Sequence, residues 1–173
     1  MTLVELCHYF NSFLHIEDFL GDPSLNGLQV QNQFPKEKQI TKVAFAVDAC
    51  QETIDKAIAE KADLLFVHHG LFWGDCLPLT NNHYDRVAAL IKNDMALYAC
   101  HIPLDASKTV GNNYGIAARL ELENQEDFGD YRVVAPICAS TGEVLFLIFN
   151  STYPITDKKI AEAATGASTL NSD

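Results

Sequence analysis

Strand and helix patterns alternate through the middle of the chain, and this alternation restricts the possible folds more than any other feature. Continuously apolar runs predict strands at 42–47, 64–67 and 96–100, and amphipathic runs between them predict helices at 51–61 and 84–93. Strands joined by helices in this order are parallel, with right-handed crossovers. Apolar residues at every strand position indicate a sheet covered on both faces. The sequence therefore predicts an α/β fold with a mostly parallel sheet flanked by helices.

Further elements are expected on both sides of this alternating region. Apolar residues recur at helical spacing over 3–20, and Thr2 with Glu5 forms a capping box at the start of that helix. Asn26-Gly27 predicts a turn before a short apolar segment. Three elements are expected towards the end of the chain: a helix over 112–120, a strand over 143–149 and a helix over 156–164.

The composition fits a single globular domain spanning residues 1–173. Hydrophobic residues make up 48% of the chain, which is long enough to bury a sizeable core. The formal net charge of −11 argues against a nucleic-acid-binding face, since such faces are usually basic. No apolar run approaches the roughly 20 residues that cross a bilayer, and the N-terminus lacks the basic flank of a signal peptide. We therefore expect neither a nucleic acid nor a membrane as a partner.

The use of cysteine indicates a reducing compartment. The chain has five cysteines, an odd number, and no two of them are spaced as C-x-x-C. This pattern argues against a disulfide framework and against a structural zinc knuckle, and it favours reduced thiols. We expect a cytoplasmic protein.

Histidines gather where two of the predicted strands end. His68 and His69 follow one strand directly, and the segment from His101 to Asp105 follows the next strand along the chain. Open α/β sheets bind their ligands at the carboxyl ends of the strands, so these side chains are expected to meet. We predict a metal site formed by His68, His69 and Asp105.

Residue type limits the metal but leaves the number of ions open. Imidazole and carboxylate together suit zinc, iron, manganese, nickel or cobalt better than calcium or magnesium. Successive strand residues point to opposite faces, so His68 and His69 can share one ion only if the strand has ended, and Gly70 permits a turn there. Alternatively, each histidine binds a different ion of a pair about 3.5–4 Å apart, with Asp105 bridging the two.

Other polar and aromatic residues near these motifs have two possible roles each. His101 is either a ligand or, as we favour, a group that supports the ligands or faces a substrate. Asp48 lies at the same sheet edge, although capping of the following helix is favoured. His83 is expected to be a helix cap or a surface group. Phe72 and Trp73 either shield the site or, as we favour, pack in the core.

Three motifs resemble the signatures of the GTP cyclohydrolase I type 2 homologues, also called the NIF-three-like family. They are Asn26-Gly27-Leu28-Gln29-Val30, His68-His69-Gly70-Leu71-Phe72-Trp73 and His101-Ile102-Pro103-Leu104-Asp105. The resemblance covers about residues 3–115, in the family's order. It implies a dinuclear centre of two divalent ions such as zinc, iron or manganese, with His68, His69 and Asp105 as ligands. It also implies assembly into a ring-like homohexamer.

The same resemblance implies ligands that this chain does not supply. Relatives are longer and add a histidine and a glutamate ligand near their C-terminus, whereas the last histidine here is His101. We therefore expect this chain to be truncated at its C-terminus relative to the family. Solvent, another subunit or occupancy by a single ion would compensate for the missing ligands.

The function expected from this site is hydrolysis assisted by metal. Some relatives open the purine ring of GTP by hydrolysis, which makes a nucleotide the expected substrate and gives His101 a role in moving protons. One alternative is a non-catalytic metal-binding scaffold or regulatory interaction protein. Another is a phosphoesterase that uses a similar mechanism with two metal ions.

Overall fold

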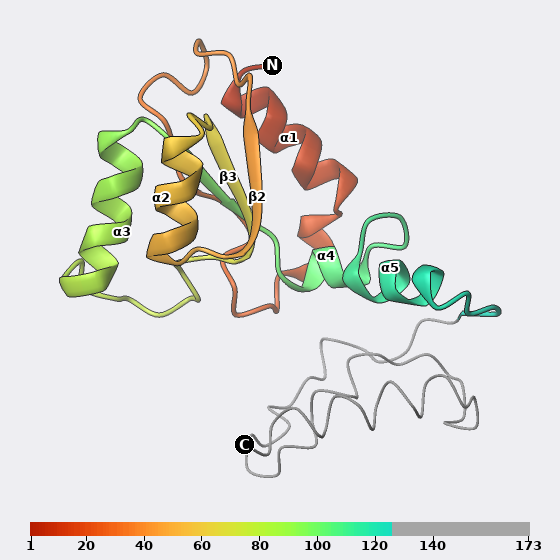
Figure 1. Cartoon of the computed structure of the whole chain (residues 1–173). Helices are drawn as coiled ribbons and strands as arrows, with labels where there is room; N and C mark the ends of the chain where they lie inside the picture. The colour runs from red at the N-terminus through yellow and green to blue at the C-terminus, as the bar shows by residue number, and fades with distance from the viewer. Residues whose placement is uncertain (126–173) are drawn as a thin grey trace. The chain divides into compact units, whose positions relative to one another are not determined.

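A computed structural model of the protein describes residues 1–125 (Figure 1). The chain divides into two compact units, Met1–Ser107 and Lys108–Asp173, which are described separately. The strand expected over 143–149 and the helix expected over 156–164 lie outside the described residues. The expectation of a single domain over residues 1–173 stays a prediction.

The first unit is built on a four-stranded sheet with the strand order β1-β4-β3-β2. Its strands are β1 (Gly27–Val30), β2 (Val43–Asp48), β3 (Leu64–His69) and β4 (Ala96–Ala99). Strands β2, β3 and β4 are parallel, and β1 pairs antiparallel with β4. The prediction of a mostly parallel sheet in an α/β fold is therefore confirmed.

Helices cover both faces of this sheet, as the continuously apolar strands predicted. The helices of this unit are α1 (Leu3–Phe13), the 3₁₀ turn η1 (Ile16–Phe19), α2 (Gln51–Ala59), α3 (Asn81–Lys92) and α4 (Ile102–Ala106). In Figure 1, α2 and α3 lie side by side on one face of the sheet, and α1 lies on the opposite face. Among residues 1–125, no helix is long and apolar enough to cross a membrane.

The first helix begins as predicted but ends early. Thr2 and Glu5 form the expected capping box, in which each side chain accepts a hydrogen bond from the backbone N–H of the other. The sequence predicted a helix over 3–20, whereas α1 ends at Phe13. His15 has a left-handed conformation, with φ of 52°, and this conformation separates α1 from the 3₁₀ turn that follows.

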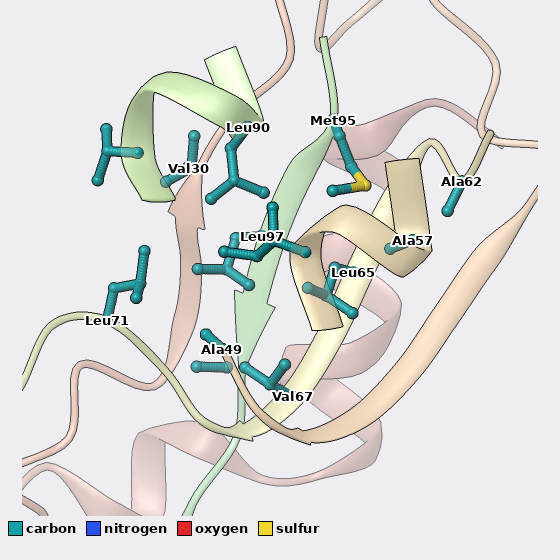
Figure 2. Packing of buried hydrophobic residues seen from close by; sticks show 13 residues of the cluster. Val30, Ala49, Ala57, Ala62, Leu65, Val67, Leu71, Leu90, Met95 and Leu97 are labelled. Atoms are coloured by element: carbon teal, nitrogen blue, oxygen red, sulfur yellow. The ribbon is translucent and has the colours of Figure 1, made fainter. Parts of the chain in front are cut away.

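Alternation along the strands divides the core into two layers. Leu65, Val67 and Leu97 belong to a cluster that includes residues of α2 and α3, shown in Figure 2. Their neighbours Phe66 and Tyr98 belong to a second cluster that includes residues of α1. Because successive strand residues point to opposite faces, a strand with both faces covered is apolar throughout. The sheet is thereby fixed between two layers, and the ends of its strands provide a rigid base for polar side chains.

In the second unit, the described residues include the helix α5 (Asn112–Arg119), which agrees with the prediction of a helix over 112–120. The ammonium group of Lys108 lies 6.0 Å from the centre of the Tyr114 ring. This separation is at the outer limit of a cation–π contact.

Candidate metal centre

The histidine pair lies on β3 itself rather than in the turn after it. The ladder between β2 and β3 continues to the pair Asp48–His69, and the backbone carbonyl of His69 accepts a hydrogen bond from the backbone N–H of Ala49 at 2.9 Å. The expectation that the strand ends before His68 is therefore wrong, because pairing with β2 extends it. The two imidazole rings nevertheless lie next to each other, with 4.5 Å between their centres.

Each ring of this pair is held by a different neighbouring strand. Nδ1 of His68 lies 3.0 Å from the backbone carbonyl oxygen of Cys100, which follows β4. Nδ1 of His69 lies 2.7 Å from Oδ1 of Asp48, the last residue of β2. Carbonyl and carboxylate oxygens only accept hydrogen bonds, so both Nδ1 atoms carry the proton. In the neutral rings, the Nε2 atoms are then left with their lone pairs.

Asp105 lies against His68. Its Oδ2 is 3.4 Å from Nε2 of His68, and both side chains are largely buried. When the imidazole is neutral, that Nε2 carries a lone pair, and two hydrogen-bond acceptors then face each other across this gap. Such a pair is stabilised by a positive charge, which either a metal ion or a proton on the imidazole supplies. This arrangement is what two ligands of one positive ion require.

His101 completes the group of imidazoles. Its ring centre lies 5.0 Å from that of His68 and 5.6 Å from that of His69. One ring nitrogen from each of the three histidines lies within 4.8 Å of the other two. The geometry thus places His101 beside the predicted ligand pair, and the supporting or substrate-facing role that the sequence favoured stays a prediction.

A buried carboxylate supports His101 from behind. Nδ1 of His101 lies 3.1 Å from Oδ1 of Asp22, whose side chain is 0% exposed. The backbone N–H of His101 donates to Oδ1 of Asn26 at 2.7 Å. The sequence did not identify Asp22, because Gly21-Asp22-Pro23 gives only the signal of a helix end. Asn26 belongs to a recognised motif, but its contact with His101 spans 75 positions and has no local signature.

Burial and hydrogen bonding set the charge of two groups at the site. Burial lowers the pKa of His68, an effect that the nearby Asp105 carboxylate partly opposes. The neutral imidazole is thereby favoured, which is the form that binds metal. Burial alone would raise the pKa of Asp22, but hydrogen bonds from His101, Asn26 and two backbone N–H groups lower it to about 2. Asp22 is therefore ionised at neutral pH.

The donor set fits a transition metal. Two atoms that bind one tetrahedral zinc ion, each at about 2.1 Å, are roughly 3.4 Å apart. This is the separation of Nε2 of His68 from Oδ2 of Asp105. Each of the three imidazoles is oriented by an oxygen acceptor at Nδ1, as metal-binding histidines in proteins usually are. The cluster could hold a metal ion, and the assignment of His68, His69 and Asp105 as ligands stays a prediction.

Neither Asp48 nor His83 caps a helix in the structure. Asp48 does not cap α2, because the capping position belongs to Cys50 and no side chain caps that helix. His83 does not cap α3, whose capping residue is Thr80; its ring instead packs edge-on against Phe72.

Trp73 lies against the site. Its ring centre is 4.9 Å from that of His101, and the two rings meet edge to face. Its indole N–H donates to the backbone carbonyl of Gly70 at 3.1 Å, which fixes the ring. The sequence favoured core packing for both Phe72 and Trp73, and this description fits Phe72, which packs against the cluster covered by α2 and α3.

Comparison with known proteins identifies the relatives of this chain. Residues 1–170 match the family described as Duf34/NIF3 (NGG1p interacting factor 3). A protein of Treponema pallidum (strain Nichols) named "GTP cyclohydrolase 1 type 2 homolog" is 52% identical over 136 residues, covering 78% of this chain and 46% of that protein. A Deinococcus radiodurans protein of the same name is 46% identical over 74% of this chain and 47% of its own length. The chain thus spans about half the length of the curated relatives it matches.

Solved structures give the same result for the fold. The crystal structure of TTHA1606 from Thermus thermophilus has a TM-score of 0.70 and 43% sequence identity, covering 74% of this chain and 51% of that one. Reduced HcgD from Methanocaldococcus jannaschii has a TM-score of 0.65 and 32% identity, covering 75% and 51%. The first of these likenesses extends over about three quarters of this chain, so it includes most of the described sheet and helices.

Proposed function

Because the chain belongs to the Duf34/NIF3 family, we propose that it is a metal-dependent hydrolase whose substrate is a purine nucleotide such as GTP. The proposal includes a centre of two divalent ions held by His68, His69 and Asp105, as the resemblance to the family implies. The name shared by the bacterial relatives supports the cyclohydrolase class. We further propose that the protein acts in the cytoplasm.

One observation carries this proposal. The lone pair at Nε2 of His68 faces the Asp105 carboxylate at 3.4 Å, with two more imidazoles beside it. Burial lowers the pKa of His68, which favours the neutral imidazole that a metal ion requires. A divalent ion satisfies both acceptors at once.

At such a centre, different residues of the chain hold the ion, orient the imidazoles and contact the substrate. A divalent ion, when bound, supplies Lewis acidity that makes water a nucleophile near neutral pH. His68, His69 and Asp105 hold the ion, and Cys100 and Asp48 fix the two imidazoles through their Nδ1 atoms. The half-buried Trp73 provides an aromatic wall beside the site. A planar purine ring can pack against such a wall.

The acidic character of the chain bears on how a nucleotide is held. With a net charge of −11, the protein offers little general attraction to a triphosphate. Divalent cations at the site would offset the phosphate charge locally. We therefore expect nucleotide binding to require metal rather than to precede it.

The test combines metal analysis with turnover. The protein is loaded with zinc, manganese or iron, its metal content is measured, and GTP is followed by the loss of guanine absorbance. We expect bound metal and turnover above a metal-only control, with both lost in His68→Ala. His8→Ala is the matched control, because His8 is an exposed histidine on α1. Full metal loading without turnover of GTP or other nucleotides would contradict the enzymatic proposal.

A second candidate is a non-catalytic metal-binding scaffold. The strongly acidic composition favours it, since such a surface suits a protein partner or metal handling better than a polyanionic substrate. In that case metal binds, His68→Ala loses it, and no nucleotide is consumed. The same measurements therefore separate the two candidates.

We also propose that the protein assembles as a homo-oligomer, a hexameric ring by resemblance to its family. In the described part of the chain, β2 is an edge strand that exposes apolar side chains, with Phe45 71% and Val47 62% exposed. Exposed apolar edge strands commonly pair with other chains. Light scattering coupled to size-exclusion chromatography measures the mass directly, and a monomer at micromolar concentration would contradict this assembly.

A further inference from the structure

Asp22 is a carboxylate with an unusually complete set of donors for a residue outside the predicted ligand set. Its side chain is 0% exposed, and it lies in the connection between η1 and β1. Oδ1 accepts from the backbone N–H of Ser24 at 3.0 Å, and Oδ2 accepts from the backbone N–H of Ile102 at 3.1 Å and from Nδ2 of Asn26 at 2.8 Å. A buried charge of this kind needs such donors to be tolerated.

The fourth donor is the imidazole of His101. Nδ1 of His101 lies 3.1 Å and 3.3 Å from the two carboxylate oxygens of Asp22. Asn26 holds both partners, because its Nδ2 donates to Asp22 while its Oδ1 accepts the backbone N–H of His101 at 2.7 Å. Both the ring and the backbone of His101 are therefore fixed.

This contact determines which ring nitrogen carries the proton. The Asp22 carboxylate can only accept, so Nδ1 of His101 must donate, and in the neutral ring Nε2 then keeps its lone pair. The His101 ring lies next to the rings of His68 and His69 and meets the Trp73 ring edge to face. The Nε2 lone pair of His101 is therefore part of the candidate metal centre. A free histidine in water favours the opposite tautomer, with the proton on Nε2. Asp22 therefore imposes a choice that the ring would not make alone.

We propose that Asp22 is a positioning residue, which with Asn26 locks His101 in the Nδ1–H tautomer and presents its Nε2 as a fixed acceptor to molecules bound at the site. The tautomer needs no metal and no substrate, because every group that sets it belongs to the chain. Its role during turnover rests on the proposed function. There, Nε2 of His101 accepts a hydrogen bond or a proton from the attacking water or from the substrate.

The first measurement reads the tautomer directly. The metal-free protein, labelled with ¹⁵N at histidine, is recorded at pH 8 with long-range ¹H–¹⁵N correlation, and His101→Gln identifies the His101 signals. We expect the wild-type protein to show a protonated Nδ1 and an unprotonated Nε2 at His101. In Asp22→Asn, we expect a mixture or reversal of the two forms. Asp55→Asn is the matched control, since Asp55 is an exposed residue of α2.

The wild-type spectrum alone decides the tautomer, so the test does not depend on how well the Asp22 variant folds. A wild-type His101 protonated at Nε2 overturns the inference. An unchanged tautomer in a folded Asp22→Asn protein, with circular dichroism like that of the wild type, overturns it as well.

The second measurement asks what the fixed imidazole does. We expect Asp22→Asn to keep its metal content and its KM for GTP while kcat falls about 100-fold, the usual size of the effect of one positioned acid–base group. Loss of metal together with kcat overturns the positioning role, because His101 would then act as a ligand. If the tautomer is as expected but no protein turns over any nucleotide, the inference about Asp22 stands and the proposed function fails.

Discussion

The side-chain amide of Gln29 occupies the space in which a side chain at position 70 would have to lie. A Cβ atom built on Gly70 would be 2.4 Å from Oε1 of Gln29 and 2.6 Å from Cβ of Ala99. Oε1 of Gln29 also accepts the backbone N–H of Leu71 at 2.7 Å. Strand β1 thereby holds the segment that leaves the histidine pair, and Gly70 is required for close packing rather than for a special backbone conformation.

Gly70→Ala is expected to destabilise the protein. The new methyl group meets the Gln29 amide and the Ala99 side chain, and overpacking of this kind costs about 1–3 kcal/mol. Urea denaturation of the metal-free protein measures the loss. Gly115→Ala is the control, because a Cβ there meets nothing within 4 Å and the helix α5 gains propensity. A Gly70→Ala protein as stable as the wild type would show that this packing is not tight.

Gln29→Met tests the hydrogen bonds separately from the packing. Methionine has a similar volume but offers no strong acceptor, so the backbone N–H groups of Leu71 and Phe72 lose their partner. We expect a loss of about 1–3 kcal/mol in the free energy of unfolding. Hydrogen exchange at both amides should become faster, whereas the control Gln31→Met, at an exposed position, should leave it unchanged. Unchanged protection in Gln29→Met would contradict the role of this side chain.

Asp48→Asn is expected to weaken metal binding while leaving the fold intact. The carboxylate orients His69 through Nδ1 at 2.7 Å, and loss of such a support typically raises the dissociation constant for metal about 10-fold or more. The Asp48 side chain is 60% exposed, so little stability depends on it. Competition with a chromophoric chelator measures zinc affinity, and Asp55→Asn serves as the control. Equal affinities in wild type and Asp48→Asn would remove Asp48 from the site.

The sheet could be predicted from the sequence because its signal is local. Strand β3 is apolar at every position before the histidine pair, and every residue of β4 is buried. Both faces of the sheet are indeed covered. The turn predicted at Asn26-Gly27 marks the start of β1, whose first residue, Gly27, has the positive φ, 108°, that glycine favours. Where an element is defined by its own residues, the pattern was enough.

The ends of helices depend on tertiary contacts that the pattern of apolar residues in the sequence does not contain. The first helix was predicted to continue to residue 20, because Gly21-Asp22-Pro23 gives the signal of a helix end, yet His15 has a left-handed backbone. Adjacent apolar residues of α3 also differ in burial, since Leu90 is buried whereas Ile91 is exposed. In both cases packing against the rest of the fold outweighed local preference.

The site was predictable only in part. His68 and His69 are conspicuous because they follow an apolar run, and Asp105 follows the next strand. Asp22 is a single acidic residue before a proline, and its contact with His101 joins positions 79 residues apart. No periodicity or spacing encodes a contact of that kind. The residues that support a site are therefore harder to read from one sequence than the residues that form it.

At acid pH, we expect the protein to lose the stability that Asp63 contributes at the end of the sheet opposite the histidines. Its Oδ2 accepts from the backbone N–H and the hydroxyl of Thr41 at 2.8 Å each and from the backbone N–H of Lys42 at 3.0 Å. Burial alone would raise the pKa of Asp63, but these hydrogen bonds and Lys38 lower it. Because the side chain is only 16% exposed, we expect Asp63→Asn to cost about 1–3 kcal/mol at pH 7.

The pH dependence of this cost follows from the lowered pKa of Asp63. A carboxyl group whose pKa is lower in the folded than in the unfolded protein stabilises the folded state. This contribution is complete above the unfolded-state pKa, which is about 3.9 for aspartate. That contribution is lost as the pH falls through the folded-state pKa. The difference in unfolding free energy between wild type and Asp63→Asn should therefore be constant near neutrality and shrink below about pH 4. Glu52→Gln, which affects only an exposed pair with Lys56, is the control and should show little effect at any pH. A wild-type advantage over Asp63→Asn that persists undiminished in acid would mean that packing, rather than the charge, is what Asp63 contributes.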